Sequence, residues 1–122
     1  MLKQGEYLIA SLQPSLTDES LVRLQRSLVE SVGRLRCHGV IIDVTGTEVL
    51  DSFATRTIRD IAYMVKLRGA ETVIVGIQPE VAFTMVQLGL SLLNVKTALD
   101  LEEGLAYLDQ RGSGGMQRDG AP

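Results

Sequence analysis

The stretch Val40-Ile41-Ile42-Asp43-Val44-Thr45, followed shortly by Val49-Leu50-Asp51-Ser52-Phe53, decides how this chain folds. The first segment is a short apolar run rich in β-branched residues, which is typical of a strand covered on both faces in a parallel sheet. Asp and Ser favour the start of a helix, so the second segment predicts a helix that begins near Ser52. The expected unit is a buried strand, an acidic and hydroxyl-rich loop, and a helix.

Strands and helices alternate on both sides of this unit. The expected strands are residues 7–12, 40–44, 72–77 and 94–97, and the expected helices are residues 17–35, 52–68, 79–88 and 100–110. Such alternation predicts an α/β fold with a mixed, mostly parallel sheet of four to five strands and about four helices packed on it.

Length and composition indicate one globular domain, because 122 residues with 45% hydrophobic side chains suffice for a single core. Residues 112–122 have no periodicity and little to bury, so we expect a domain over 1–111 and a flexible tail over 112–122. The net charge of -3 argues against general nucleic-acid binding. No membrane-spanning run or signal peptide is evident, so the expected location is cytoplasmic.

Ser52 is the candidate functional residue, because its hydroxyl lies at the start of the expected helix. Unpaired N–H groups and the helix dipole favour an anion such as phosphate at that position. Asp51 and Ser52 are also ordinary capping residues, which stabilise a helix by roughly 0.5–2 kcal/mol relative to alanine. The residues alone leave both roles open, and one does not exclude the other.

Nothing in the sequence indicates an active site. His38 is the only histidine, and it precedes the strand that leads to Ser52, so we expect it at the opposite end of that strand. Asp43, Glu48 and Asp51 could gather around a divalent cation, but acidic residues at strand ends are more often solvated or capping. The sequence therefore predicts a protein that is not an enzyme and that holds no metal and no cofactor.

The third expected helix and the loop after it contain more apolar residues than one helix face can bury. Either they form core together with a buried loop, or part of this surface meets another subunit. The residues are Val81, Ala82, Phe83, Met85, Val86, Leu88, Leu90, Leu92 and Leu93.

Several segments together resemble the STAS domain of sulfate transporters and anti-sigma-factor antagonists. Simple antagonists of this family usually carry Asp-Ser-Ser/Thr-Gly-Leu-Gly at the central helix start, where this chain has Phe53-Ala54-Thr55-Arg56 after Asp51-Ser52. The chain therefore looks most like the single-domain scaffolds of the bacterial stressosome. The matching segments are residues 43–45, 50–52, 69–73, 75–79, 88–90 and 97–105, and the resemblance covers residues 2 to about 110.

The resemblance implies a phospho-switched scaffold. Ser52 would be phosphorylated by a switch serine kinase and reset by a cognate phosphatase. The chain would co-assemble with sensory STAS-domain homologues into a large assembly that holds the kinase until phosphorylation releases it. The loop around the phosphosite would consist of Asp43, Thr45, Thr47, Glu48 and Asp51.

Other interpretations remain open at this point. Thr45, Thr47 and Thr55 are further hydroxyls that could accept phosphate, although a loop or capping role suits each of them at least as well. The chain could also be a free anti-sigma-factor antagonist that binds an anti-sigma kinase one-to-one. A third possibility is a nucleotide-binding STAS module that uses the loop from Thr45 to Ser52.

Overall fold

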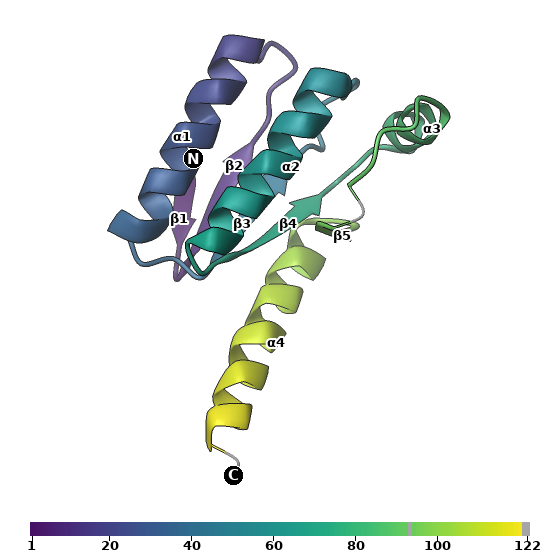
Figure 1. Ribbon diagram of the computed structural model, residues 1–122. Coiled ribbons are helices and arrows are strands. Elements are labelled where there is room, and N and C mark those ends of the chain that lie inside the picture. Colours follow the sequence, from purple (N-terminus) through teal and green to yellow (C-terminus); the bar gives the residue numbers. More distant parts are fainter. Residues whose placement is uncertain (93, 121–122) are drawn as a thin grey trace.

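The computed structural model describes residues 1–92 and 94–120, with side chains described as far as Arg111. Strands and helices alternate along the chain as expected (Figure 1). The elements are β1 (Leu2–Gln4), β2 (Tyr7–Ser11), α1 (Asp18–Arg34), β3 (Gly39–Asp43), α2 (Ser52–Leu67), β4 (Glu71–Val75), α3 (Pro79–Gln87), β5 (Lys96–Ala98) and α4 (Leu101–Gly120).

The sheet has five strands in the order β1-β2-β3-β4-β5. β1 pairs antiparallel with β2, whereas the other neighbours are parallel, so the predicted mixed, mostly parallel sheet is confirmed. β1 was not expected from the sequence. Its residues are all exposed and show no apolar alternation, and a turn through Gly5 (φ 60°) brings them back onto β2.

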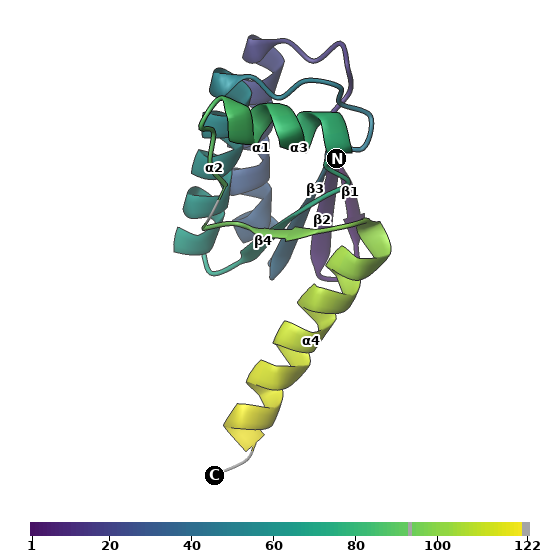
Figure 2. The same ribbon diagram turned by 90° about the vertical axis from the view of Figure 1, so that its right-hand side faces the viewer.

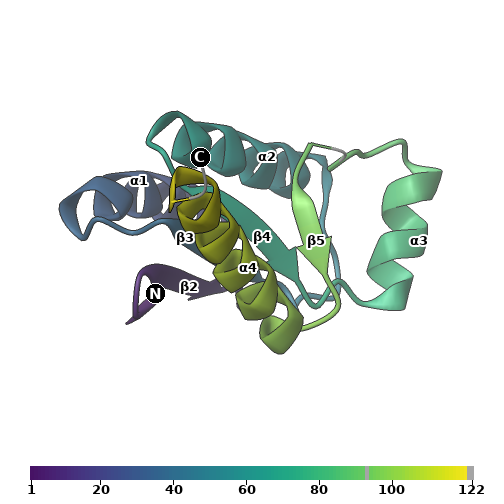
Figure 3. The same ribbon diagram turned by 90° about the horizontal axis from the view of Figure 1, so that it is seen from below.

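Helices cover both faces of the sheet (Figures 2 and 3). Val40 and Ile42 of β3 belong to the larger core on the α1 and α2 face, whereas Ile41 belongs to the smaller core on the α4 face. All three side chains are completely buried. The continuous apolar run of β3 follows from this burial on both faces, because alternate residues of a strand point in opposite directions.

The predicted helix starts are confirmed, and one predicted helix end is wrong. Thr17 and Asp51 are the N-caps of α1 and α2. We expected the last helix to end at Gln110, but α4 continues to Gly120 and extends beyond the sheet (Figure 2). Residues 121–122 of the expected tail lie outside the described residues. The flexibility of residues 112–122 stays a prediction.

α3 leaves much of its apolar surface uncovered, which agrees with the excess of apolar residues seen in the sequence. Val81 and Met85 are buried, whereas Phe83, Val86 and Leu88 are 66%, 79% and 63% exposed. Leu93, the last residue of that apolar set, lies outside the described residues. Within the described parts of the chain, no helix is long and apolar enough to cross a membrane.

Candidate functional site

The connection from β3 to α2, residues 44–51, lies at the carboxyl edge of the sheet. We call it the β3–α2 loop. The backbone N–H of Val44 donates to the Val75 carbonyl at 3.0 Å, and that of Leu12 donates to the Asp43 carbonyl at 2.9 Å. The end of β3 is therefore held between its two parallel neighbours, and the loop starts from a fixed position.

Asp51, not Ser52, caps α2. The Asp51 carboxylate Oδ1 accepts a hydrogen bond of 2.7 Å from the backbone N–H of Ala54, and Asp51 has extended backbone dihedrals. Ser52 is the first helical residue, and its side chain is exposed. The hydroxyl of Ser52 thus lies beside the amino end of a helix whose capping bond comes from its neighbour.

Hydrogen bonds from three elements hold the β3–α2 loop. The N–H of Thr45 donates to Asp43 Oδ1 at 2.9 Å, and the Gln78 side-chain Nε2 donates to the Thr45 carbonyl at 2.5 Å. Further along, the Thr47 hydroxyl donates to the Leu12 carbonyl at 3.5 Å. Gln78 was not expected to be part of the site, and its only signal in the sequence was its position in the segment 75–79.

The three threonines considered as further phosphosites differ in accessibility. Thr45 is exposed, whereas Thr47 is 9% and Thr55 2% exposed. The Thr55 hydroxyl is buried without a hydrogen-bond partner among the described residues. In this conformation an enzyme can reach Thr45 but not Thr55, and the Thr47 hydroxyl is already engaged.

The acidic residues of the loop do not converge on one point. Glu48 and Asp51 are exposed and Asp43 is half-buried. No group of three or more His, Cys, Asp or Glu residues suited to a metal ion occurs in the described part of the chain. His38 lies at the amino end of β3, as expected, and its Nε2 is 3.5 Å from Glu6 Oε1.

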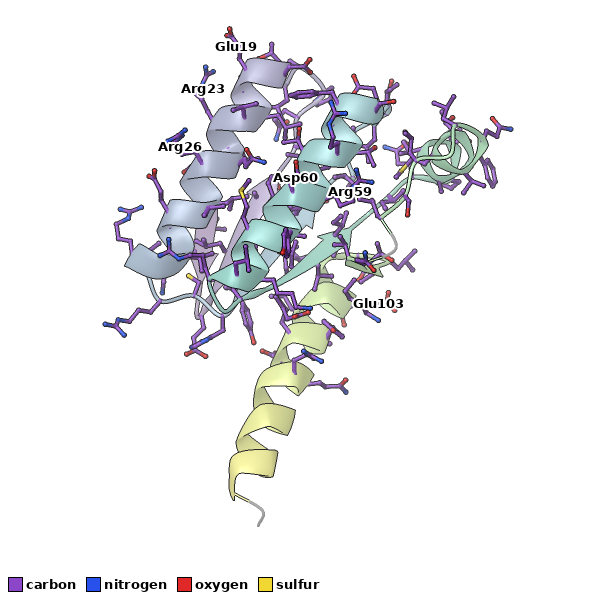
Figure 4. All side chains as sticks on the ribbon, viewed as in Figure 1. Glu19, Arg23, Arg26, Arg59, Asp60 and Glu103 are labelled. Atoms are coloured by element: carbon purple, nitrogen blue, oxygen red, sulfur yellow. The ribbon has the colours of Figure 1, made fainter. Side chains whose placement is uncertain are left out.

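A surface of apolar and charged side chains adjoins the start of α2, where Ser52 lies. A shallow depression of about 370 Å³ lies between α1 and the start of α2, lined by Asp18, Glu19, Val22, Arg23 and Phe53. Glu19 and Arg23 project outward from α1, Glu19 nearer its amino end (Figure 4). Val49 in the neighbouring loop is 69% exposed. This surface can contact a protein that approaches Ser52.

The fold and the site together define the class of protein. The family model of the STAS domain matches residues 1–104, and the chain therefore belongs to the STAS-domain family. This result confirms the resemblance found in the sequence.

Within the family, the similar proteins include RsbT co-antagonist proteins. The chain is 34% identical over 91 residues to the RsbT co-antagonist protein RsbRA of Bacillus subtilis, a match that covers 75% of this chain and 33% of that protein. The chain thus spans about a third of the length of the curated relatives it matches first.

Two solved structures match nearly the whole chain. A serine-to-glutamate variant of RsbS from Moorella thermoacetica is 32% identical, with a TM-score of 0.80 over 92% of this chain and 95% of that one. A chain from the architecture of the stressosome, described as a signal integration and transduction hub, is 33% identical with a TM-score of 0.78. This match covers 91% of this chain and 96% of that one.

Proposed function

We propose that this chain is a non-enzymatic scaffold and phospho-switch of a bacterial stressosome, with Ser52 as the phosphorylated residue. One observation carries the proposal: the Ser52 hydroxyl is exposed at the start of α2 while Asp51 makes the capping hydrogen bond. Phosphate on Ser52 therefore leaves the capping bond in place. The similarity to RsbS over nearly the whole chain supports the same function.

Phosphorylation changes the surface charge far more than the fold. A phosphoserine adds a charge of about -1.5 to -2 at neutral pH. The amino end of α2 attracts this charge, whereas the Asp51 and Glu48 carboxylates repel it. Since Ser52 is exposed, its phosphate is accommodated without repacking the core. In this mechanism the unphosphorylated surface holds a switch serine kinase, the added phosphate releases the kinase, and a cognate phosphatase resets the site.

Assembly with other STAS domains is the second part of the proposal. The relatives matched first are about three times longer than the matched segment, which fits partners that carry additional sensory sequence. The exposed apolar side chains of α3 and of the residue that follows it, namely Phe83, Val86 and Leu88, offer a surface for association with a second STAS domain. A cytoplasmic assembly of this kind would present many copies of Ser52 together to the kinase.

The test is phosphorylation of the full chain by a switch serine kinase with ATP, followed by intact-mass spectrometry and fragmentation. We expect one phosphate, located on Ser52, and none in Ser52→Ala. The matched control Ser15→Ala removes another exposed serine and should incorporate phosphate like the wild type. Phosphate that persists in Ser52→Ala would contradict the assignment.

Kinase capture and complex size test the switch itself. The authentic phosphoprotein and Ser52→Asp should bind the kinase more weakly than the unmodified chain. Light scattering should detect large complexes with a sensory STAS homologue. A small one-to-one complex with the kinase alone would instead indicate a free anti-sigma-factor antagonist. Equal kinase binding before and after phosphorylation would overturn the switch.

A further inference from the structure

Gln78 uses its side chain in an unusual way for its position. It is the N-cap residue of α3, but its side chain makes no capping hydrogen bond to that helix. The side-chain Nε2 reaches the β3–α2 loop instead and donates to the Thr45 carbonyl, 33 residues away in the sequence. Helix α3 is thereby tied directly to the loop that precedes Ser52.

The backbone at Gly76, two residues before Gln78, packs closely against Thr45, the loop residue that Gln78 binds. Gly76 has a φ of 80°, and a Cβ added there would lie 2.0 Å from the Thr45 hydroxyl oxygen and 3.2 Å from its Cα. The turn from β4 into α3 therefore contacts Thr45 through both its backbone and the Gln78 amide. On the other side of the loop, Thr47 bonds to Leu12. The loop is held from two sides, and Gln78 provides the side-chain contact from α3.

We propose that Gln78 is a positioning residue for Ser52: its amide holds the β3–α2 loop in the conformation from which Ser52 is phosphorylated. The inference rests on the proposed function of Ser52. A kinase requires the acceptor hydroxyl at a defined place relative to its own groups, so a loop that samples other conformations presents Ser52 correctly for less of the time. The apparent affinity falls by the same fraction, and KM rises while kcat changes little.

The experiment compares two substitutions at Gln78 with the same two at Gln87. Gln78→Met removes the donor at similar size, and Gln78→Glu replaces the donor with a carboxylate that faces the Thr45 carbonyl. Gln87 is exposed at the end of α3, so Gln87→Met and Gln87→Glu match the chemical changes without touching the loop. Initial rates of Ser52 phosphorylation are measured over a range of substrate concentrations, alongside the thermal midpoint of each variant.

We expect both Gln78 variants to raise KM, with kcat nearly unchanged. For Gln78→Met the rise is at most about tenfold, the full factor that corresponds to one lost hydrogen bond. The Gln87 variants should behave like the wild type. Amide hydrogen exchange gives a readout that does not depend on the kinase. The N–H groups of Thr45 and Thr47 should exchange faster in the Gln78 variants, whereas those in the middle of α1 should not change.

Three results would overturn the inference. Equal KM values for the Gln78 and Gln87 variants would show that the amide does not position Ser52. Faster exchange throughout the chain would show general destabilisation instead of a local effect. Absence of phosphate on the wild-type Ser52 would overturn the proposed function itself, and this failure is visible before any variant is compared.

Discussion

The two ends of the parallel sheet use their polar side chains differently. At the amino end, the side chains bind one another and thereby fasten α4 and the β1–β2 turn to the sheet. The Tyr7 hydroxyl donates to Asp109, Arg111 lies 3.7 Å from Glu71, His38 lies 3.5 Å from Glu6, and Lys96 lies over the Tyr107 ring at 4.8 Å.

At the carboxyl end, polar side chains bind the backbone, and the acidic residues Glu48 and Asp51 stay exposed to solvent. Gln78 and Thr47 bind main-chain carbonyls, and Asp51 binds a main-chain N–H. Neither ion pair found among the described residues involves Glu48 or Asp51. The amino end therefore pairs its charged side chains with one another, whereas the carboxyl end combines a fixed backbone with acidic groups that a partner can contact.

The largest effect of a substitution at the carboxyl end is expected for Gly76→Ala. Positive φ alone costs a non-glycine residue about 1–3 kcal/mol, and the contact with Thr45 adds to this cost. Gly69 is the control, because its φ is 89° and a Cβ there meets nothing within 4 Å. Denaturant unfolding should show a larger loss of stability for Gly76→Ala than for Gly69→Ala. Equal losses would mean that Thr45 moves aside at no cost.

Asp51→Ala should lower the free energy of unfolding by about 0.5–2 kcal/mol, because it removes the N-cap of α2. Thr17→Ala removes the N-cap of α1, whose hydroxyl accepts from the Ser20 N–H at 3.1 Å, and should cost a similar amount. Only Asp51→Ala should also change the rate of Ser52 phosphorylation. A change of the same size in Thr17→Ala would mean that global stability, not the local cap, determines that rate.

At the amino end, stability should depend on alkaline pH through Tyr7. Burial, together with the hydrogen bond to Asp109, raises the pKa of the Tyr7 hydroxyl to about 12. The pKa of the same group in the unfolded chain is about 10. The neutral phenol therefore contributes stability that is complete below pH 10 and is lost as the pH rises towards 12. Urea unfolding between pH 9 and 12 should show this loss in the wild type and a smaller one in Tyr7→Phe.

The smallest effects are expected for single exposed charges. Arg111→Ala breaks a partly exposed ion pair with Glu71 and should cost less than about 1 kcal/mol. Glu48→Gln should change stability by less than about 0.5 kcal/mol. It should, however, alter the salt dependence of kinase association, whereas Arg111→Ala should not. Surface plasmon resonance at two salt concentrations checks this, and identical responses of both variants would contradict the division of roles.

The sequence predicts those parts of the fold that depend on local signals. The apolar run around Ile41 marks the central strand, and Thr17 and Asp51 mark helix starts, because capping and periodicity act over a few residues. β1 was missed because Leu2–Gln4 has no buried residue and becomes a strand only by pairing with β2.

The same distinction between local signals and contacts of distant segments applies to the functional site. Ser52 could be identified from the strand–loop–helix pattern around it. Gln78 could not, because its contact with Thr45 exists only once β3 and β4 lie side by side. The burial of Thr55 could also not be predicted from the local sequence, because a hydroxyl residue in the first turn of a helix can face either solvent or core.

Both outer strands of the sheet are short, and this limits how copies of the chain can associate. β1 and β5 have three residues each, and each carries a lysine, Lys3 and Lys96 respectively. Short and charged edge strands offer few free backbone groups to an incoming strand and discourage open-ended growth of a sheet. This favours association of domain copies through helices and loops, where side-chain shape decides which partner fits and where an assembly can close at a defined size.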